Sequence, residues 1–207
     1  MSQELFGGQP VIEFENEFDR RSFLKYATLV GVGGTLVAAL PATSAFAADT
    51  GDLGILQYAL TLEYLEAEFY QKGVAANILG DMQKYITPIA AHEAAHVQAL
   101  TATITKLGGT PVAKPTFKFP DGTFTDKATF LKTASTFEEV GVKAYHGQVT
   151  LIKDGAILGA AASIAGVESR HAGVLNYLNN TKIVPAPIEG HATMDETLAA
   201  VKPFLGA

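Results

Sequence analysis

Six acidic and imidazole side chains occur in this sequence as two copies of one pattern. In each copy a glutamate is followed 30 residues later by a Glu-x-x-His motif, and the second copy begins 75 residues after the first. The six residues are Glu63, Glu93, His96, Glu138, Glu168 and His171. A tyrosine lies seven residues after the first glutamate of each copy, at Tyr70 and Tyr145. An internal repeat of this kind predicts two similar units that pack against each other.

Apolar residues recur at steps of three and four between residues 52 and 180, which predicts helices. We expect four helices: the first over about 52–76, a second that ends at about 107, a third from 126 to about 152 and a fourth over about 156–179. Pro88 fits either the first turn of a helix capped by Thr87 or a kink inside a longer helix. Residues 109–124 contain three prolines and three phenylalanines and form a long connection. The expected fold is all-α: a four-helix bundle over 48–180 with one long crossover between helices two and three, then a tail (181–207) with a short helix near 193–202.

The six repeated residues interrupt the apolar stripes of all four helices, so the pattern places them in the core. A buried, unpaired carboxylate loses several kcal/mol of hydration, by a rough estimate. Two divalent cations would balance four carboxylates, and carboxylate with imidazole suits iron, manganese or zinc. The midpoints of the two 30-residue spans fall at Ile78 and Lys153, beside turn signals, so the residues of each hairpin meet at one level. We therefore predict a two-metal site, with two Fe ions or alternatively Mn.

Two alternatives stay open for these six residues. One is a buried salt-bridge network, although the nearby cations, Arg170 and Lys143, do not balance four glutamates. The other is a degenerate site that folds but binds metal weakly.

One glutamate from each of two helices plus Glu-x-x-His from each of the other two is the di-iron carboxylate pattern. Residues 52–180 resemble the ferritin-like superfamily. Residues 62–70 (LEYLEAEFY), 137–145 (FEEVGVKAY) and 165–171 (AGVESRH) are similar to an exported ferritin-like family that includes plant desiccation-related proteins. The resemblance implies a ferritin-like bundle with the six repeated residues as ligands.

Other polar residues near these positions are expected to lie elsewhere. Glu66, Glu68 and Glu139 fall off the stripes and are expected at the surface, with Glu139 as the substitute ligand if a helix phase slips. His92, His146 and His191 are expected to be exposed. Tyr70 and Tyr145 either hydrogen-bond a ligand from a neighbouring helix, serve as redox shuttles or are amphipathic core residues. The phenylalanines of 111–124 either pack along the bundle or form a docking surface.

Residues 1–47 predict an export signal. Arg20 and Arg21 precede an apolar stretch of about 15 residues, which is too short for a spanning helix, and a small-residue run with Ala45-Phe46-Ala47 as the cleavage triplet follows. The paired arginines indicate the twin-arginine (Tat) pathway, with an ordinary secretory signal or a retained anchor as alternatives. We expect a protein of the periplasm or cell envelope without a stable transmembrane anchor.

The composition narrows the choice of function. The chain of 207 residues has no cysteine, which excludes thiolate sites, and its net charge of −6 argues against nucleic-acid binding. We expect a redox protein that acts on dioxygen or peroxide, as a ferroxidase, an oxidase or a catalase-like enzyme. Alternatives are a structural or stress-protective envelope protein whose metals only stabilise the bundle, and iron sequestration. The expected partners are metal ions, dioxygen or peroxide, a second copy of the chain or an envelope protein.

Overall fold

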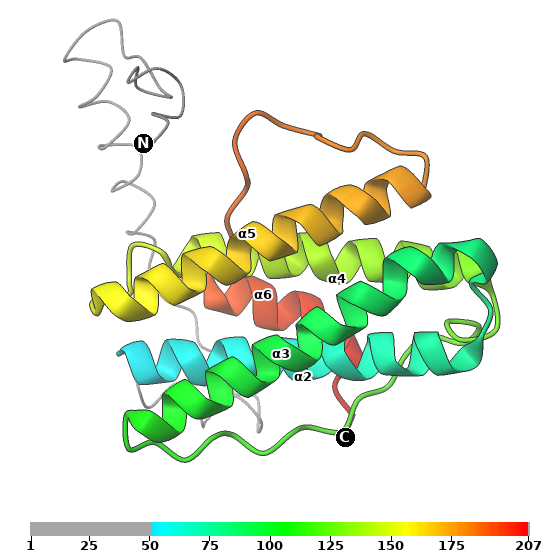
Figure 1. The fold of residues 1–207 in the computed structure, drawn as a ribbon. Helices are drawn as coiled ribbons and strands as arrows, with labels where there is room; N and C mark the ends of the chain where they lie inside the picture. Colours follow the sequence, from blue (N-terminus) through cyan, green and yellow to red (C-terminus); the bar gives the residue numbers. More distant parts are fainter. Residues whose placement is uncertain (1–50, 207) are drawn as a thin grey trace, which may run out of the picture. The chain divides into compact units, whose positions relative to one another are not determined.

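The computed structural model describes residues 51–206. The predicted export signal lies outside this range. Four long helices form the bundle: α2 (Asp52–Ala76), α3 (Gln83–Lys106), α4 (Lys127–Gln148) and α5 (Gly155–Leu178). A shorter helix, α6 (Met194–Val201), follows in the tail, and two 3-10 turns cover Gly80–Met82 and Lys202–Phe204. The predicted all-α bundle is therefore confirmed (Figure 1).

Local signals explain most of the helix ends. Asn77 ends α2 in the left-handed conformation, and Gly108 has a positive φ just beyond α3. Asp126 caps α4 by accepting a hydrogen bond from the Thr129 backbone, and Asp154 caps α5 in the same way. The alternative with Thr87 as a cap is wrong, because α3 begins at Gln83 and Pro88 lies inside it.

The long connection between α3 and α4 follows the length of the bundle, as Figure 1 shows. Its phenylalanines pack inward rather than forming a docking surface: Phe117 is buried, and Phe119 and Phe124 contact Phe69 of α2. The tail folds back onto the same structure. Gly206 N–H donates to the Thr116 carbonyl, and Ala192 N–H donates to the Lys143 carbonyl of α4.

Two apolar clusters fill the bundle. One contains an aromatic group in which the ring of Phe69 stacks on Phe130 at 4.7 Å and meets Phe137 edge-on at 5.0 Å. The other lies toward the beginning of α2 and α5 and consists of aliphatic residues and Tyr145. The polar residues of the repeat lie between these two ends. None of the helices within 51–206 is long and apolar enough to cross a membrane.

Gly73→Ala should destabilise the protein by about 1–3 kcal/mol, because the added methyl group overpacks the core. A Cβ at Gly73 would lie 2.1 Å from the Phe130 ring. Gly159→Ala in α5 is the matched control, since nothing lies within 4 Å of its Cβ position. That substitution should stabilise the helix by roughly 0.5–1 kcal/mol. Denaturant unfolding measures both, and equal effects would contradict the packing described here.

Candidate metal centre

The four helices bring all six repeated residues into one buried cluster. Glu63 comes from α2, Glu138 from α4, and the two Glu-x-x-His motifs from α3 and α5. The four glutamates are 0% exposed, and both histidines are buried. The helical spacing of three residues places each histidine on the same face as its glutamate.

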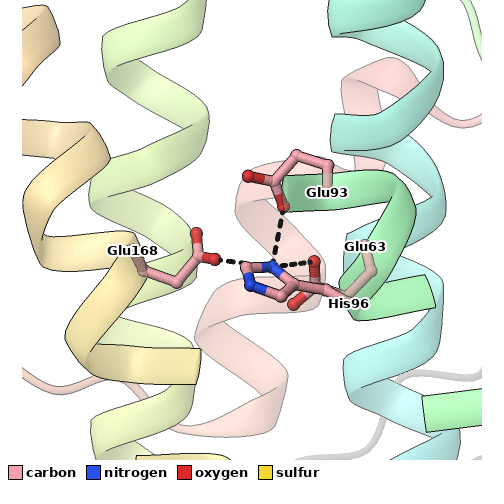
Figure 2. Close-up of side chains that lie close together, drawn as sticks. All are labelled: Glu63, Glu93, His96 and Glu168. Carbon is pink, nitrogen blue, oxygen red and sulfur yellow. Dashed lines mark hydrogen bonds and ion pairs between the residues drawn. The ribbon is translucent and has the colours of Figure 1, made fainter. Parts of the chain in front are cut away.

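The cluster divides into two overlapping groups of four residues. Within each group, one ligand atom of every residue lies within 4.8 Å of the others. The first group is Glu63, Glu93, His96 and Glu168, shown in Figure 2, and the second is Glu93, Glu138, Glu168 and His171. Glu93 and Glu168 belong to both groups, so these two carboxylates are placed to bridge a pair of ions. Each group then keeps one glutamate and one histidine of its own.

His96 lies at the centre of the first group. Its Nδ1 is 3.1 Å from Glu93 Oε2, 3.1 Å from Glu168 Oε1 and 3.3 Å from Glu63 Oε2 (Figure 2). A single N–H cannot donate well to three acceptors. Glu63 Oε2 and both oxygens of Glu168 consequently have no hydrogen-bond partner among the described residues.

His171 is placed similarly in the second group. Its Nδ1 is 2.9 Å from Glu93 Oε1 and 3.3 Å from Glu138 Oε2. None of these three atoms makes a hydrogen bond of acceptable geometry within the described chain. The contacts are therefore close but not oriented as donor and acceptor.

These separations fit metal coordination. Two ligand atoms bound about 2.1 Å from one ion at right angles lie about 3.0 Å apart. The observed nitrogen–oxygen distances of 2.9–3.3 Å match that spacing. The unpaired buried oxygens would be free to coordinate the same ions. A chain in which these atoms served only a salt-bridge network would leave them unsatisfied, which costs stability.

The surroundings of the carboxylates shift their pKa values in different directions. Burial raises the pKa of Glu63 and of Glu168 well above the ordinary value, and repulsion from neighbouring glutamates adds to it. Burial also opposes ionisation of Glu93, but the close contact with His171 and the hydrogen bond with His96 outweigh it and lower the pKa of Glu93 to about 2.

The histidines carry the balancing charge when no metal is bound. Burial alone would lower the pKa of His96, yet the surrounding carboxylates of Glu168, Glu63 and Glu93 raise it to about 12. The pKa of His171 rises to about 10 because Glu138 and Glu93 outweigh burial in the same way. Two protonated imidazoles thus supply the positive charge that divalent ions would otherwise bring to the glutamates.

The two repeated tyrosines cross-link the halves of the site. Tyr145 of α4 donates to Glu63 Oε1 of α2, and Tyr70 of α2 donates to Glu138 Oε1 of α4, both at 2.5 Å. Burial, followed by repulsion from the carboxylate that each contacts, raises the pKa of both phenols well above the ordinary value. Both tyrosines therefore remain protonated donors that orient a carboxylate from the opposite helix.

Glu66 was expected at the surface, and this expectation is wrong. Its side chain is 3% exposed, and burial plus repulsion from Glu168 and Glu138 raises its pKa well above the ordinary value. Space for it exists because the residue 75 positions later is Gly141: a Cβ there would lie 3.2 Å from Glu66 Oε1 and 3.3 Å from Glu168 Oε2. The sequence signal was the step of three from Glu63 together with the glycine at the repeat-related position.

His92 is exposed as expected, but it also contacts the site. Its Nδ1 lies 2.9 Å from His171 Nε2, and the two rings stack at a centroid distance of 5.2 Å. A hydrogen bond to the outer nitrogen of a metal-ligating histidine fixes its tautomer and ring orientation. His92 is therefore a positioning residue for His171.

The remaining polar candidates lie outside the cluster. Glu68 forms ion pairs with Lys72 and Lys114, and Glu139 accepts a hydrogen bond from Asn176, so Glu139 does not replace a ligand. Arg170 is exposed and donates to the Gly166 carbonyl. The other two histidines, His146 and His191, also lie away from the cluster: His146 is half-buried against the Val142 carbonyl rather than exposed, and His191 is exposed.

Without metal, the protein should lose stability as the pH rises from about 5 to about 9. Folded Glu63, Glu66 and Glu168 keep protons that the unfolded chain releases above the ordinary glutamate pKa of 4.5. Folded His96 and His171 likewise keep protons that the unfolded chain releases above 6.5. The folded state binds more protons throughout this interval, so the free energy of unfolding falls. Thermal melts after chelation at pH 5, 7 and 9 measure it, and a rising midpoint would contradict the assignment.

Metal affinity should change in the opposite direction. The ligands must lose their protons to bind an ion, so the affinity for Fe(II) or Mn(II) should increase with pH. Calorimetric titration in buffers of different ionisation enthalpy counts the protons released, and a value near zero would argue against these histidines as ligands.

Glu66→Gln should reduce the pH-dependent loss of stability in the metal-free protein, because one carboxyl group no longer has to ionise inside the core. Glu139→Gln is the matched control on α4 and should leave the pH dependence unchanged. The same chelated melts compare the two variants. Identical slopes for both would mean that Glu66 is not coupled to the cluster.

Comparison with known protein families agrees with this geometry. A family model described as a ferritin-like domain matches residues 51–181, and comparison with curated proteins gives no match. The matched range covers the four long helices and every residue of the cluster. The chain therefore belongs to the ferritin-like domain family.

Proposed function

We propose that this chain is an exported protein that binds two Fe or two Mn ions between its helices and is redox-active toward dioxygen or peroxide. The observation that supports this most directly is the sharing of Glu93 and Glu168 between two four-residue groups. A shared pair of carboxylates suits two neighbouring ions better than one. A pair of redox-active ions would supply the electrons that reduce dioxygen or peroxide.

The protein's own residues would prepare the site for that chemistry. Glu63 and His96 would hold one ion, Glu138 and His171 would hold the other, and Glu93 and Glu168 would contribute to both. Tyr70 and Tyr145 hold the terminal carboxylates through hydrogen bonds from across the bundle. Burial keeps bulk water away from the glutamates, which strengthens every electrostatic interaction in the site. These ligands do not separate Fe from Mn.

Elemental analysis of the purified protein should find about two Fe or Mn ions per chain, as the shared bridging pair implies. Glu93→Ala/Glu168→Ala should lose most of this metal, because each ion loses two of its four protein ligands. Glu139→Ala/Glu189→Ala removes the same charge outside the cluster and should retain the metal. Absence of metal from the wild type, even after anaerobic loading with Fe(II) and Mn(II), would refute the redox proposal.

Assays on the metal-loaded protein separate the redox function from a purely structural one. Consumption of dioxygen or peroxide that disappears in Glu93→Ala/Glu168→Ala supports a ferroxidase, oxidase or catalase-like activity. Metal that raises the melting temperature without any turnover would favour the structural or stress-protective alternative.

Export is proposed from the pattern in residues 1–47, which lie outside the described range. Arg20→Lys/Arg21→Lys should block transport by the twin-arginine pathway and leave the unprocessed chain in the cytoplasm. Cell fractionation with an antibody against the bundle measures this, and unchanged processing would point to an ordinary secretory signal.

A further inference from the structure

A cavity lies beside the carboxylate cluster, between the first halves of α2 and α5 and the second halves of α3 and α4. It leaves about 50 Å³ in which the centre of a water-sized molecule can lie. Leu62 and Tyr145 line it, and both adjoin the cluster, since Leu62 precedes Glu63 and the Tyr145 hydroxyl donates to Glu63. The exposed alanines Ala99 and Ala160 also line it, which places the mouth between α3 and α5. Its walls are mostly apolar with few polar groups, which is typical of small-molecule pockets.

The internal repeat shows why this end of the bundle is hollow. A shift of 75 residues relates positions at the cavity to positions at the opposite, aromatic end. Six residues that line the cavity are smaller than their counterparts: Ile55, Leu62, Ala99, Thr103, Ala144 and Ala161 correspond to Phe130, Phe137, Val174, Leu178, Phe69 and Ile86. Those counterparts fill the opposite end, where Phe69, Phe130 and Ile86 are completely buried. The chain therefore has one packed end and one end from which side-chain volume has been removed.

Two polar residues of the cavity reverse this trend. Tyr58 replaces Thr133 and is directed toward Thr197 of α6. Gln148 replaces Gly73, and its side chain is 3% exposed. Neither the amide nitrogen nor the amide oxygen of Gln148 has a hydrogen-bond partner among residues 51–206. A buried amide without a partner costs stability, so its presence in an otherwise apolar wall needs an explanation.

We propose that this cavity binds a small, mainly apolar organic molecule that carries one hydroxyl or carbonyl oxygen. The apolar walls would bury the body of the molecule, and the oxygen would pair with the Gln148 amide. Water could pair with the amide but would leave the apolar walls wetted, which is unfavourable. A role for the bound molecule as the organic substrate of the metal centre rests on the function proposed above, whereas its binding does not.

Benzyl alcohol and toluene are suitable probes, because they share an apolar ring and differ in one hydroxyl group. Isothermal titration of the purified protein should show one saturable site, with benzyl alcohol bound at least tenfold more tightly than toluene. Gln148→Leu should bind the two probes equally, because the polar partner is gone. Gln71→Leu removes an exposed glutamine at the opposite end of α2 and should leave the tenfold preference unchanged.

Filling the cavity provides an independent test. Ala161→Ile introduces the side chain found at the repeat-related position and should reduce the affinity for both probes at least tenfold. Thr103→Leu, which copies the repeat-related Leu178, serves the same purpose from α3 if the first variant does not fold. No saturable binding to the wild type, or binding that both filled variants retain, would overturn the proposal. A preference that survives in Gln148→Leu would overturn the assigned role of the amide.

The outcome can be separated from that of the metal proposal by measuring the metal content of the same samples. Protein that holds no metal but binds benzyl alcohol would contradict the proposed function and leave this site standing. Protein that holds two ions but binds neither probe would overturn this inference alone.

Discussion

Repulsion among buried carboxylates is the interaction on which the rest of this bundle depends. Five glutamates contributed by four helices are nearly or completely inaccessible to solvent, and no lysine or arginine reaches them within the described chain. Two protonated histidines and raised glutamate pKa values relieve the repulsion when no metal is present, and the two tyrosines donate hydrogen bonds to one carboxylate each. Each of these devices lowers the cost of the same cluster. Divalent ions would neutralise the glutamates in place of these protons, and they would also be coordinated by them.

The two copies of the internal repeat match at the six residues of the cluster and differ at the residues around them. Glu66 faces Gly141, Gln148 takes the place of Gly73, and the position related to His92 is Val167. These differences give one half of the site an extra carboxylate, one histidine a solvent-facing partner and the wall of the cavity a polar group. A symmetric site would offer two ions the same surroundings, whereas the surroundings of the two groups of four residues differ here. The asymmetry therefore resides in the residues that are not ligands.

The crossover and the tail convert α2 into an interior helix. Gln57 of α2 exchanges hydrogen bonds with the backbone of Thr110 and Val112, and Lys114 pairs with Glu68. Helix α6 adds Val201 to the aromatic cluster, and the end of the tail pairs with residues 116–118 of the crossover. These segments cover faces of α2 that a bare four-helix bundle would expose. They also explain why α2 is buried far beyond a single stripe.

The sequence alone determined the helices, their order, the long crossover and the six residues that meet in the core, because those properties follow from periodicity, caps and one repeated spacing. It did not determine the buried state of Glu66, since a stripe of three- and four-residue steps describes contact with one neighbour and α2 has several. It gave no sign of the contact between His92 and His171 or of the cavity at Gln148, because both depend on how side chains of different helices meet across the bundle. Periodicity records which face of a helix turns inward. Only the tertiary structure decides what that face meets, because distances between helices are set by the packing of all of them together.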